Sequence, residues 1–495
     1  MLLVDRRQGA QTKPAQLPAA AAEPLPPPAP GNCTPELRRR IGWGVATAAY
    51  QVEGGWDEGG RSPSVWDVFA HKPGTTAGGA TGDVACDMYH KYEEDFELMA
   101  RLGIRHYRLS LSWSRLLPQG GAGTPVSPEG LAFYNRLIDA MLARGIEPYV
   151  TLYHWDLPQV LQDAYGGFLD GARFVPDFAY YAAAAFEAFG GRVKNWITFN
   201  EPWVVCKLHY GDGTFAPGIP FGLAGQYACG HTLLLAHAAA AALYARQYYK
   251  PSQRGRLGVA LSMTWHEPGS ASEADARAAQ NARDSEIGWF ADPLFGGDYP
   301  ESLRRTVGAA LPAFSDAERA AFAAHPLDFL GINFYTARYA FSDGTPWGFA
   351  PSETDAAGAP IGPRAQSSWL LVVPWAFRRL LLYVSGRYGG PEVFVTENGV
   401  SVPGEAGVAD PAAAARDAFR TDFYRGYLDS LCTAVAEGAN VTRYFAWSFM
   451  DNFEWRMGYT ERFGIVAVNF TDPARPRTVK DSARYLAQHF FRAGA

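Results

Sequence analysis

Eight short β-rich segments recur along this chain, each separated from the next by a longer segment of helical character. The segments are GWGVATAA, RHYRLSLSW, EPYVTLYHW, NWITFNEP, RLGVALSM, DFLGINFY, EVFVTENG and RYFAWSF. Helical patterns between them include 94–101, 129–144, 175–189, 376–387 and 415–437. Strands and helices that alternate without a Pro/Gly/Ser-rich linker are typical of βα units around a parallel sheet. Eight such units predict an α/β fold, a single (β/α)8 TIM barrel with enlarged βα loops such as 343–367.

The N-terminal segment has a different composition. Residues 1–38 are rich in Pro and Ala, include the run LPPPAP and show no hydrophobic periodicity. Such a segment cannot bury enough apolar surface to offset its conformational entropy. We therefore predict a disordered segment at 1–38 and one barrel domain at 39–495. The opening residues MLLVDRRQ contain too short an apolar run for a clear signal peptide.

Composition excludes several classes of partner. The net charge of -6 leaves no basic stripe for a phosphate backbone, so no nucleic-acid partner is expected. No apolar run approaches the roughly 18 residues that span a bilayer, and 232–244 is expected to be a buried helix. The five cysteines are odd in number, far apart and in no CxxC pattern, so no metal site is predicted. We expect a soluble protein, with the cytoplasm slightly favoured and the compartment otherwise open.

Polar and aromatic side chains gather at the ends of the predicted strands. In a (β/α)8 barrel the chemistry takes place at that end, where strands pass into βα loops. Any one of these side chains could be an ordinary polar group of a loop, but seven strands carry them, and this coincidence predicts an active site. The residues are Gln51, Arg108, His154, Asn200, Glu201, Asn333, Tyr335, Glu397 and Trp447.

Two carboxylates in this set can divide the work of cleaving a glycosidic bond. Glu201 follows the fourth predicted strand and Glu397 ends the seventh, so both can face the barrel mouth. Arg108 is the expected cation beside Glu397, and Tyr335 can donate a hydrogen bond to the same carboxylate. The charge of Glu397 would then raise the pKa of Glu201 and keep it protonated. A retaining mechanism needs carboxyl groups about 5–5.5 Å apart and an inverting one about 6.5–9.5 Å, and the residues alone leave both open.

Seven motifs, taken in order, resemble glycoside hydrolase family 1, the β-glucosidase family, over 41–492. They are ATAAYQVEGGWDEGGRSPSVWD, YRLSLSWSR, TLYHWDLPQ, TFNEPW, GINFY, VTENG and WSFMDNFEWRMGYTERFG. The resemblance implies that Glu201 is the acid/base and Glu397 the nucleophile, which selects retention. Arg108, Tyr335 and Asn333 complete the implied catalytic set. No cofactor and no metal are implied, because side chains supply the acid, base and nucleophile.

The same resemblance assigns the sugar ligands. Asn200 would hold the 2-hydroxyl, where a hydrogen bond that strengthens in the transition state aids the rate. The ligands implied for the remaining hydroxyls are Gln51, His154, Glu454 and Trp455, with Trp447 as the platform under the ring. His154 could instead be a core residue satisfied by backbone groups. Trp369 matches the position of the aromatic wall against the aglycone, although the nearby Trp375 competes for that assignment.

Departures from the family pattern narrow the substrate. Members that cleave 6-phosphosugars carry a Ser and a Lys in the loop where this chain has DNFEW, and Glu454 would repel a phosphate. Thioglucoside-cleaving members replace the acid with Gln, whereas Glu201 is intact, so O-glycosides are expected. Plant secreted members often pair cysteines in the loop after NEP. Cys206 has no partner at the usual place, which weakens the case for an oxidising compartment.

The most consistent function is a retaining β-glycosidase, specifically a β-glucosidase acting on a β-glucoside or oligosaccharide. A transglycosidase would use the same two glutamates and pass the sugar to an acceptor other than water. A non-catalytic sugar- or partner-binding module on the same fold is the third reading, and both glutamates argue against it. The sequence leaves the aglycone, the choice of glucose over galactose or fucose, and the oligomeric state without a prediction.

Overall fold

The barrel is the central feature of the structure, a computed structural model that describes residues 31, 33–249, 254–408 and 410–492. Eight strands close into a barrel in the order β1-β11-β10-β7-β5-β4-β3-β2, and all neighbours pair in parallel. The strands are β1 (Gly42–Ala46), β2 (His106–Ser110), β3 (Glu147–Tyr153), β4 (Asn195–Asn200), β5 (Arg256–Ser262), β7 (Phe329–Asn333), β10 (Val393–Asn398) and β11 (Val441–Trp447). Seven of them lie within their predicted segments, and β11 begins two residues before the segment RYFAWSF, so the predicted (β/α)8 barrel is confirmed.

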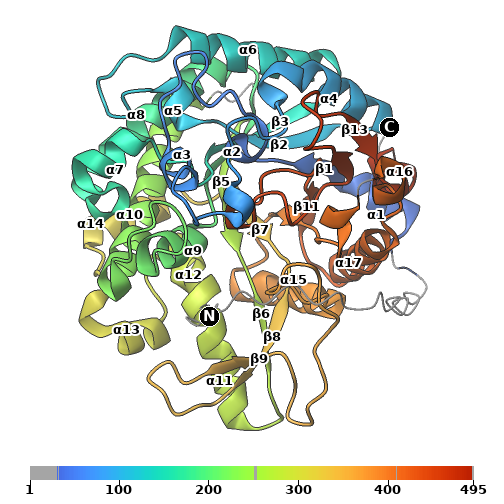
Figure 1. Cartoon of the computed structure of the whole chain (residues 1–495). Helices are drawn as coiled ribbons and strands as arrows, with labels where there is room; N and C mark the ends of the chain where they lie inside the picture. The colour runs from blue at the N-terminus through green and yellow to red at the C-terminus, as the bar shows by residue number, and fades with distance from the viewer. Residues whose placement is uncertain (1–30, 32, 250–253, 409, 493–495) are drawn as a thin grey trace.

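An outer ring of helices covers the strands, as Figure 1 shows. Its members are α4 (Met88–Leu102), α6 (Pro128–Ala143), α8 (Gly171–Phe189), α10 (Gly222–Leu243), α14 (Asp316–Ala324), α15 (Pro374–Arg387), α17 (Ala418–Ala436) and α18 (Asp481–Leu486). Because helices cover one face and the barrel interior the other, β4 and β10 are buried along their whole lengths.

The loops add short helices and two small sheets. Strands β6 (Trp265–Pro268), β8 (Ala337–Phe341) and β9 (Ala350–Ser352) form one sheet, and β12 (Val466–Val468) pairs with β13 (Arg477–Val479). The shorter helices are α2 (Ala49–Val52), α3 (Val65–Ala70), α5 (Trp113–Leu116), α7 (Gln159–Tyr165), α9 (Pro202–Val204), α11 (Glu273–Arg283), α12 (Trp289–Gly296), α13 (Glu301–Val307) and α16 (Pro411–Ala414). Strand β9 lies inside the predicted loop 343–367, so that enlargement carries structure of its own.

Aromatic rings fill the barrel below its mouth. The Phe329 and Phe394 rings stack with centroids 3.9 Å apart, and Tyr149 meets Phe445 edge-on at 4.9 Å. Buried rings contribute a large apolar area together with a defined contact geometry. A glycine leaves room where two strands approach closely, since a Cβ on Gly44 would lie 2.2 Å from the His106 carbonyl oxygen. The interior is therefore a packed core that supports the strand ends above it.

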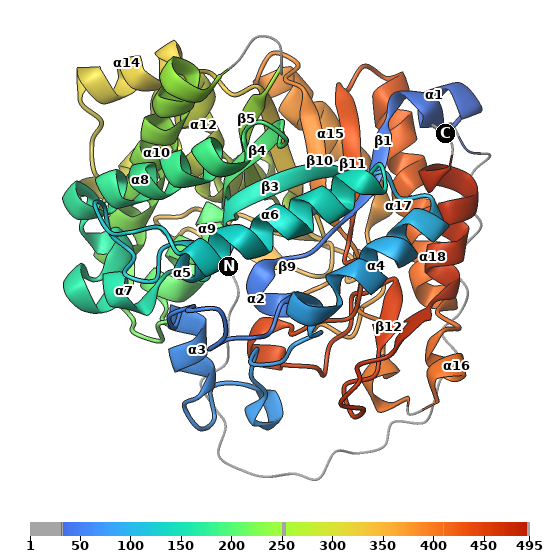
Figure 2. The same cartoon turned by 90° about the horizontal axis from the view of Figure 1, so that it is seen from above.

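Helix α1 (Pro35–Arg40) begins within the segment 1–38 that the sequence predicts to be disordered. The Thr34 side chain caps it by accepting a hydrogen bond from the Leu37 amide at 3.2 Å. Residues 1–30 and 32 of that segment lie outside the described residues. In Figure 2, α1 lies at the end of the barrel where the strands begin, whereas α2 and α3 lie at the mouth, where they finish.

Two disulfides cross-link the described chain. Cys206 bonds Cys229, with Cα atoms 5.4 Å apart, and Cys33 bonds Cys432, with Cα atoms 4.9 Å apart. Cys206 therefore has a partner 23 residues further along the chain, although the sequence offers none at the place usual in the family. Helix α10 packs against the π-helix η3 (Val205–Gly211) that carries Cys206, and this packing brings Cys229 to it.

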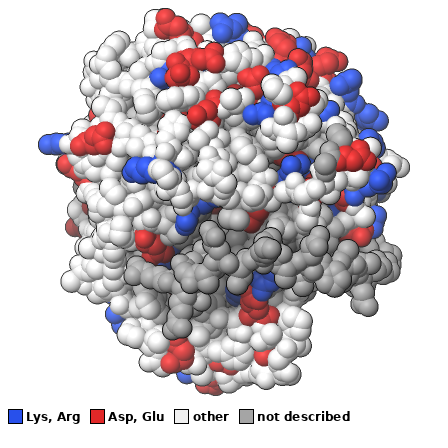
Figure 3. Space-filling view, viewed as in Figure 1, with Lys and Arg blue, Asp and Glu red and all other residues white. Residues whose placement is uncertain are grey.

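The long helix α10 extends well beyond the buried helix predicted at 232–244. It continues into a π-helix, and the 27-residue segment Gly222–Tyr248 is long and apolar enough to cross a membrane. However, 61% of its apolar window is buried inside the protein, and it packs against α8 in the outer ring. The helix is therefore a largely buried member of the outer ring and not a clear membrane span. On the face shown in Figure 3, Lys and Arg lie interspersed with Asp and Glu.

Candidate active site

Glu201 occupies the turn directly after β4, at the mouth of the barrel. Its backbone has a φ of 50°, a left-handed conformation that is uncommon for a residue with a side chain. The Asn333 side chain, at the end of β7, donates a hydrogen bond of 2.7 Å to Glu201 Oε1. The side chain is buried, with 7% of the residue exposed. Two strand ends thus fix one carboxylate in the mouth of the barrel.

Glu397, near the end of β10, is held by two donors. Arg108 Nη1 donates to Oε1 at 2.6 Å, and the Tyr335 hydroxyl donates to Oε2 at 2.7 Å. Arg108 is completely buried and pairs with this carboxylate alone among the acidic groups described. The partners predicted for Glu397 from the sequence are therefore confirmed as contacts.

The environments of the two carboxyl groups differ in charge. Burial raises the pKa of Glu201 to about 8, and the negative charge of Glu397 adds to this increase. Burial also raises the pKa of Glu397, but Arg108 and the Tyr335 hydroxyl act in the opposite direction. The group next to the guanidinium therefore ionises first, and Glu201 retains its proton.

Asn200 connects this pair to the sugar-binding side of the cluster. Its Oδ1 accepts hydrogen bonds from Arg108 at 2.7 Å and from Asn333 at 3.0 Å, so its Nδ2 is the donor that faces His154 Nε2 at 3.0 Å. Burial lowers the pKa of His154 far below its usual range, with the charge of Arg108 adding to the effect, so the ring is neutral. Because Nε2 accepts, Nδ1 carries the proton, and it has no partner among the described residues.

Gln51 and Glu454 lie next to each other at the barrel mouth. Gln51 Nε2 donates to Asn452 Oδ1 at 3.1 Å, to the Phe453 carbonyl oxygen at 3.0 Å and to Glu454 Oε2 at 3.4 Å. Gln51 Oε1 is buried without a partner in the described part of the chain. Helix α2 and the loop after β11 therefore present an amide and a carboxylate side by side.

Indole rings enclose His154. Its ring is nearly parallel to those of Trp447 and Trp455, with centroids 5.9 and 6.2 Å away. Trp455 is also stacked on Tyr50 at 6.1 Å. Flat apolar faces next to hydroxyl-binding groups suit a pyranose ring, which has apolar C–H faces and polar edges.

Trp369 lies beside the nucleophile candidate, whereas Trp375 does not. The Trp369 ring meets Tyr335 edge-on with centroids 5.6 Å apart, and Tyr335 is the residue that donates to Glu397. Trp375 is the second residue of α15, has 38% of its surface exposed and packs under Arg379. Of the two candidates for the aromatic wall, Trp369 is the one at the mouth.

A family model described as glycosyl hydrolase family 1 matches residues 34–494. The chain belongs to glycosyl hydrolase family 1. The resemblance drawn from the motifs is thus confirmed, and the protein is a glycosyl hydrolase. β-Glucosidase 4 of Oryza sativa subsp. japonica is 45% identical over 458 residues, which cover 90% of this chain and 93% of that relative.

Solved structures of the family superpose closely on this barrel. A GH1 β-glucosidase from the fungus Humicola insolens, in complex with glucose, has a TM-score of 0.88 and 40% identity, covering 91% of this chain and 98% of that one. β-Glucosidase 2 from the fungus Trichoderma reesei, in complex with Tris, has a TM-score of 0.89 and 41% identity, covering 92% and 99%.

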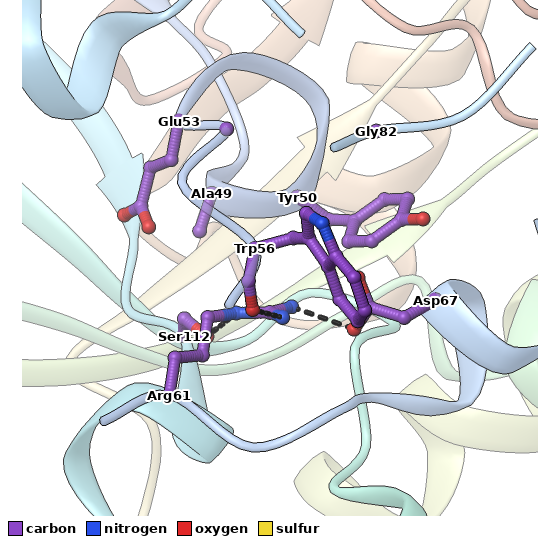
Figure 4. A pocket seen from close by; sticks show the side chains of 9 residues that line it. Ala49, Tyr50, Glu53, Trp56, Arg61, Asp67, Gly82 and Ser112 are labelled. Carbon is purple, nitrogen blue, oxygen red and sulfur yellow. Dashed lines mark hydrogen bonds and ion pairs between the residues drawn. The ribbon is translucent and has the colours of Figure 1, made fainter. Parts of the chain in front are cut away.

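In this family 1 chain, a small cavity is lined in part by residues of helix α2, and Figure 4 shows its side chains. Arg61 crosses it, donating to Asp67 at 2.9 Å, to the Trp56 carbonyl oxygen at 2.8 Å and to Ser112 at 3.3 Å. Its lining residues are Ala49, Tyr50, Glu53, Gly54, Trp56, Arg61, Asp67, Gly82 and Ser112. Gln51 follows Tyr50 directly on α2, so two residues that line this cavity, Ala49 and Tyr50, belong to the helix that carries Gln51.

Several residues of the site were missed by the sequence reasoning, since they act through other side chains. Thr151 accepts from Arg108 Nε at 3.1 Å, and Thr396 donates to Asn333 Oδ1 at 2.6 Å. Asn452 holds Gln51, and Trp155 donates to the Asn200 carbonyl oxygen at 3.0 Å. All four lie inside quoted motifs, so their position next to strand ends was the available signal. Across the described residues, no cluster of His, Cys, Asp and Glu could hold a metal ion.

Proposed function

We propose that this family 1 enzyme is a retaining β-glucosidase that releases terminal β-D-glucosyl residues from O-glycosides. The observation that carries the proposal is the unequal surrounding of the two glutamates. Arg108 and Tyr335 both donate hydrogen bonds to Glu397. No cation among the described residues forms an ion pair with Glu201, and burial raises its pKa to about 8, so it keeps its proton at neutral pH. One group is prepared as a nucleophile and the other as an acid.

In the first step, the Glu397 carboxylate attacks the anomeric carbon while Glu201 gives its proton to the leaving oxygen. The glycosidic bond breaks, the aglycone leaves as an alcohol, and the sugar stays bonded to Glu397 as an ester. In the second step, the Glu201 carboxylate takes a proton from water, whose oxygen displaces Glu397 from the same carbon. Two displacements at one carbon restore the β configuration.

The sugar is recognised by the side chains around this pair. Asn200 and its neighbour His154 hold hydroxyls next to the reacting carbon, and Gln51 with Glu454 holds hydroxyls farther from it. Trp447 and Trp455 supply the ring platform, and Trp369 forms the wall against the aglycone. Glucose is favoured because the rice relative is named a β-glucosidase and the Humicola insolens enzyme is described in complex with glucose.

The compartment follows from the cysteines. The expectation of the cytoplasm rested partly on the lack of a partner for Cys206, and that premise is replaced by the pair with Cys229. A second pair joins Cys33 to Cys432. Because disulfides persist in oxidising environments and are rare in the cytosol, we place the enzyme in an oxidising compartment. Alkylation of free thiols in protein taken from its native source tests this: one reactive thiol after unfolding, that of Cys86, is expected.

Hydrolysis of p-nitrophenyl β-D-glucoside, followed by NMR, tests the proposed mechanism. The β-anomer of glucose should appear first and then mutarotate. The β-galactoside and β-fucoside run in parallel should be slower. Early α-anomer would contradict retention, and no release of sugar from any of the three would contradict the enzyme assignment. Adding an alcohol acceptor distinguishes a transglycosidase, which would yield alkyl glycoside and little free sugar.

A further inference from the structure

Two N-x-Thr sequons lie within the described residues, and the hydrolytic mechanism uses neither. They are Asn440-Val441-Thr442 and Asn469-Phe470-Thr471, and the Asn of a third, Asn32-Cys33-Thr34, lies outside the described residues. In a secreted chain such a motif accepts an oligosaccharide, and the site must face solvent because the added group is large and hydrophilic. The two disulfides support the first condition. The folded geometry of each sequon decides the second.

The first sequon is built into the barrel, although Asn440 itself is exposed. Val441 begins β11, is buried and pairs with Val393 of β10, whose amide donates to the Asn440 carbonyl oxygen at 2.9 Å. The Thr442 hydroxyl donates to Glu392 at 2.5 Å. A transferase that binds the motif as an extended peptide would have to detach β11 from its neighbours, which opens the barrel. Once the protein has folded, this sequon is therefore closed to modification.

The second sequon lies in the loop 469–476, which joins β12 to β13 in a two-stranded sheet outside the barrel. Figure 1 shows β13 at the periphery of the molecule. The Phe470 ring packs on Tyr459, with centroids 4.2 Å apart, whereas Thr471 is exposed and Asn469 is partly exposed. The middle residue of the sequon is thus held against the protein, while the two residues that a transferase must recognise stay at the surface.

Within this loop the two recognised side chains are hydrogen-bonded to each other. The Thr471 amide and hydroxyl donate to Asn469 Oδ1 at 3.1 and 2.7 Å, which closes an Asx turn. Because a backbone amide only donates, the atom it meets is the oxygen, and the other atom of the side-chain amide is Nδ2. Nδ2 has no hydrogen-bond partner among the described residues. The nitrogen to which a sugar would be joined is therefore not engaged.

Contacts at the base of the loop fix it to the rest of the protein. Arg477, the first residue of β13, donates to both carboxylate oxygens of Asp95 on α4, at 2.8 and 2.9 Å. Arg475 donates to the Ala85 carbonyl oxygen at 3.2 Å. These contacts do not involve the Asn469 side chain. An oligosaccharide on Asn469 would therefore leave the anchoring of the loop intact.

We propose that Asn469 is an N-glycosylation site of this enzyme, which takes an oligosaccharide from a lipid diphosphate donor. Asn469 Nδ2 attacks the anomeric carbon at the reducing end of the donor oligosaccharide. An N–C bond forms, the C–O bond to the diphosphate breaks, the lipid diphosphate leaves, and one amide proton passes to a base of the transferase. The inference is independent of the glycosidase chemistry and rests on the oxidising compartment proposed above.

Peptide mapping of protein purified from its native source tests the proposal. A peptide N-glycosidase converts a glycosylated Asn to Asp, so digestion in heavy-oxygen water labels every occupied site. The peptide that contains residue 469 should carry the label, and the peptide that contains residue 440 should not. An unlabelled residue 469 would overturn the inference.

Variants secreted from a eukaryotic host locate the site within the chain. Asn469→Gln and Thr471→Ala should each lower the mass of the secreted protein by one oligosaccharide, and Thr471→Ser should keep it, because Ser retains the sequon. Asn440→Gln is the matched control: it removes another exposed sequon Asn and should keep the wild-type mass. Thr471→Ala leaves Asn469 in place, so it also tests the site if Asn469→Gln is not secreted. An unchanged mass in Thr471→Ala would contradict the assignment.

Failure of this inference is distinguishable from failure of the proposed compartment. If alkylation detects one reactive thiol, that of Cys86, and residue 469 is unmodified, only this inference is overturned. If all five cysteines react, the compartment proposal fails, and this inference fails with it. Neither result changes what hydrolysis of p-nitrophenyl β-D-glucoside says about the mechanism.

Discussion

The Arg108 guanidinium donates hydrogen bonds to side chains on three other barrel strands. It contacts Thr151 on β3, Asn200 on β4 and Glu397 on β10, and it is fully buried. Because a guanidinium remains charged at every pH of interest, it fixes the ionised state on the carboxylate it touches. The two glutamates at the barrel mouth therefore differ in protonation state because Arg108 bonds Glu397 and not Glu201.

Glu397→Ala should lower kcat for aryl β-glucosides on the order of 10⁴- to 10⁶-fold, as expected when a nucleophile is removed. Sodium azide should restore part of the rate by occupying the space of the carboxylate and attacking the anomeric carbon. The product of rescue, identified by NMR, should be the α-glucosyl azide. A β-glucosyl azide would assign Glu397 to the acid/base position instead.

Glu201→Gln should discriminate between leaving groups. An alkyl or cellobioside oxygen needs a proton as it departs, so kcat/KM for these substrates should fall about 10²- to 10⁴-fold. Dinitrophenyl glucoside departs as a stable anion, and its kcat/KM should change far less. The substitution keeps an acceptor for Asn333, so the local structure should persist. Equal losses on both kinds of substrate would remove Glu201 from the acid role.

The pH dependence of kcat/KM should be bell-shaped. Activity falls at alkaline pH because Glu201, whose pKa burial and the charge of Glu397 raise to about 8, loses the proton it must donate. Activity falls at acid pH because Glu397 becomes protonated, and its raised pKa places that limb above the usual range for Glu. In Glu201→Gln, assayed with dinitrophenyl glucoside, the alkaline limb should disappear. Its persistence there would mean that another group sets it.

At the level of elements, a buried network of charges supports the loop that carries Glu454. Lys480, directly before α18, donates to Asp451 Oδ1 at 2.8 Å and also bonds Glu405. Arg420 on α17 bonds Glu405 and donates to Asp417 at 2.6 Å. The residue after Asp451 is Asn452, which positions Gln51. The network thus joins two outer helices to the sugar-binding loop.

Lys480→Met should lower the free energy of unfolding by about 3–5 kcal/mol, because it leaves the buried carboxylate of Asp451 without its cation. The urea midpoint and the thermal midpoint measure this loss. Arg484→Met, on helix α18 that follows Lys480, is the control, since its pair with Asp481 is exposed and should be worth less than about 1 kcal/mol. Equal destabilisation by the two substitutions would contradict a structural role for the buried network.

The strand ends could be predicted because a barrel strand has two local features in the sequence: an apolar run, and a change to polar residues where the run ends. Arg108 and Tyr335 could be assigned to Glu397 since each ends or follows such a run. Asn452 could not, because its effect passes through Gln51, a residue 401 positions away in the chain. Cys229 could not be paired with Cys206 for a related reason: the pairing depends on how α10 folds back on η3, which no local pattern records.

On the scale of the whole molecule, the barrel has no sheet edge, and β11 closes it by pairing with both β1 and β10. The strand order places the first and last strands side by side. Residues far apart in the sequence therefore share the mouth, as Gln51 after β1 and Glu454 after β11 do. In a barrel with this strand order, the residues after β1 and those after β11 come together only when β11 pairs with β1.

The pair Cys33–Cys432 has a consequence of its own for this architecture. Its members are 399 positions apart, so the backbone between them and the sulfur bridge form one covalent ring that contains every barrel strand except β11. A protease that cuts one loop within the ring produces two polypeptides that the sulfur bridge still joins, so neither is released. On a denaturing gel the nicked chain should stay intact without a reducing agent and separate into two pieces with one.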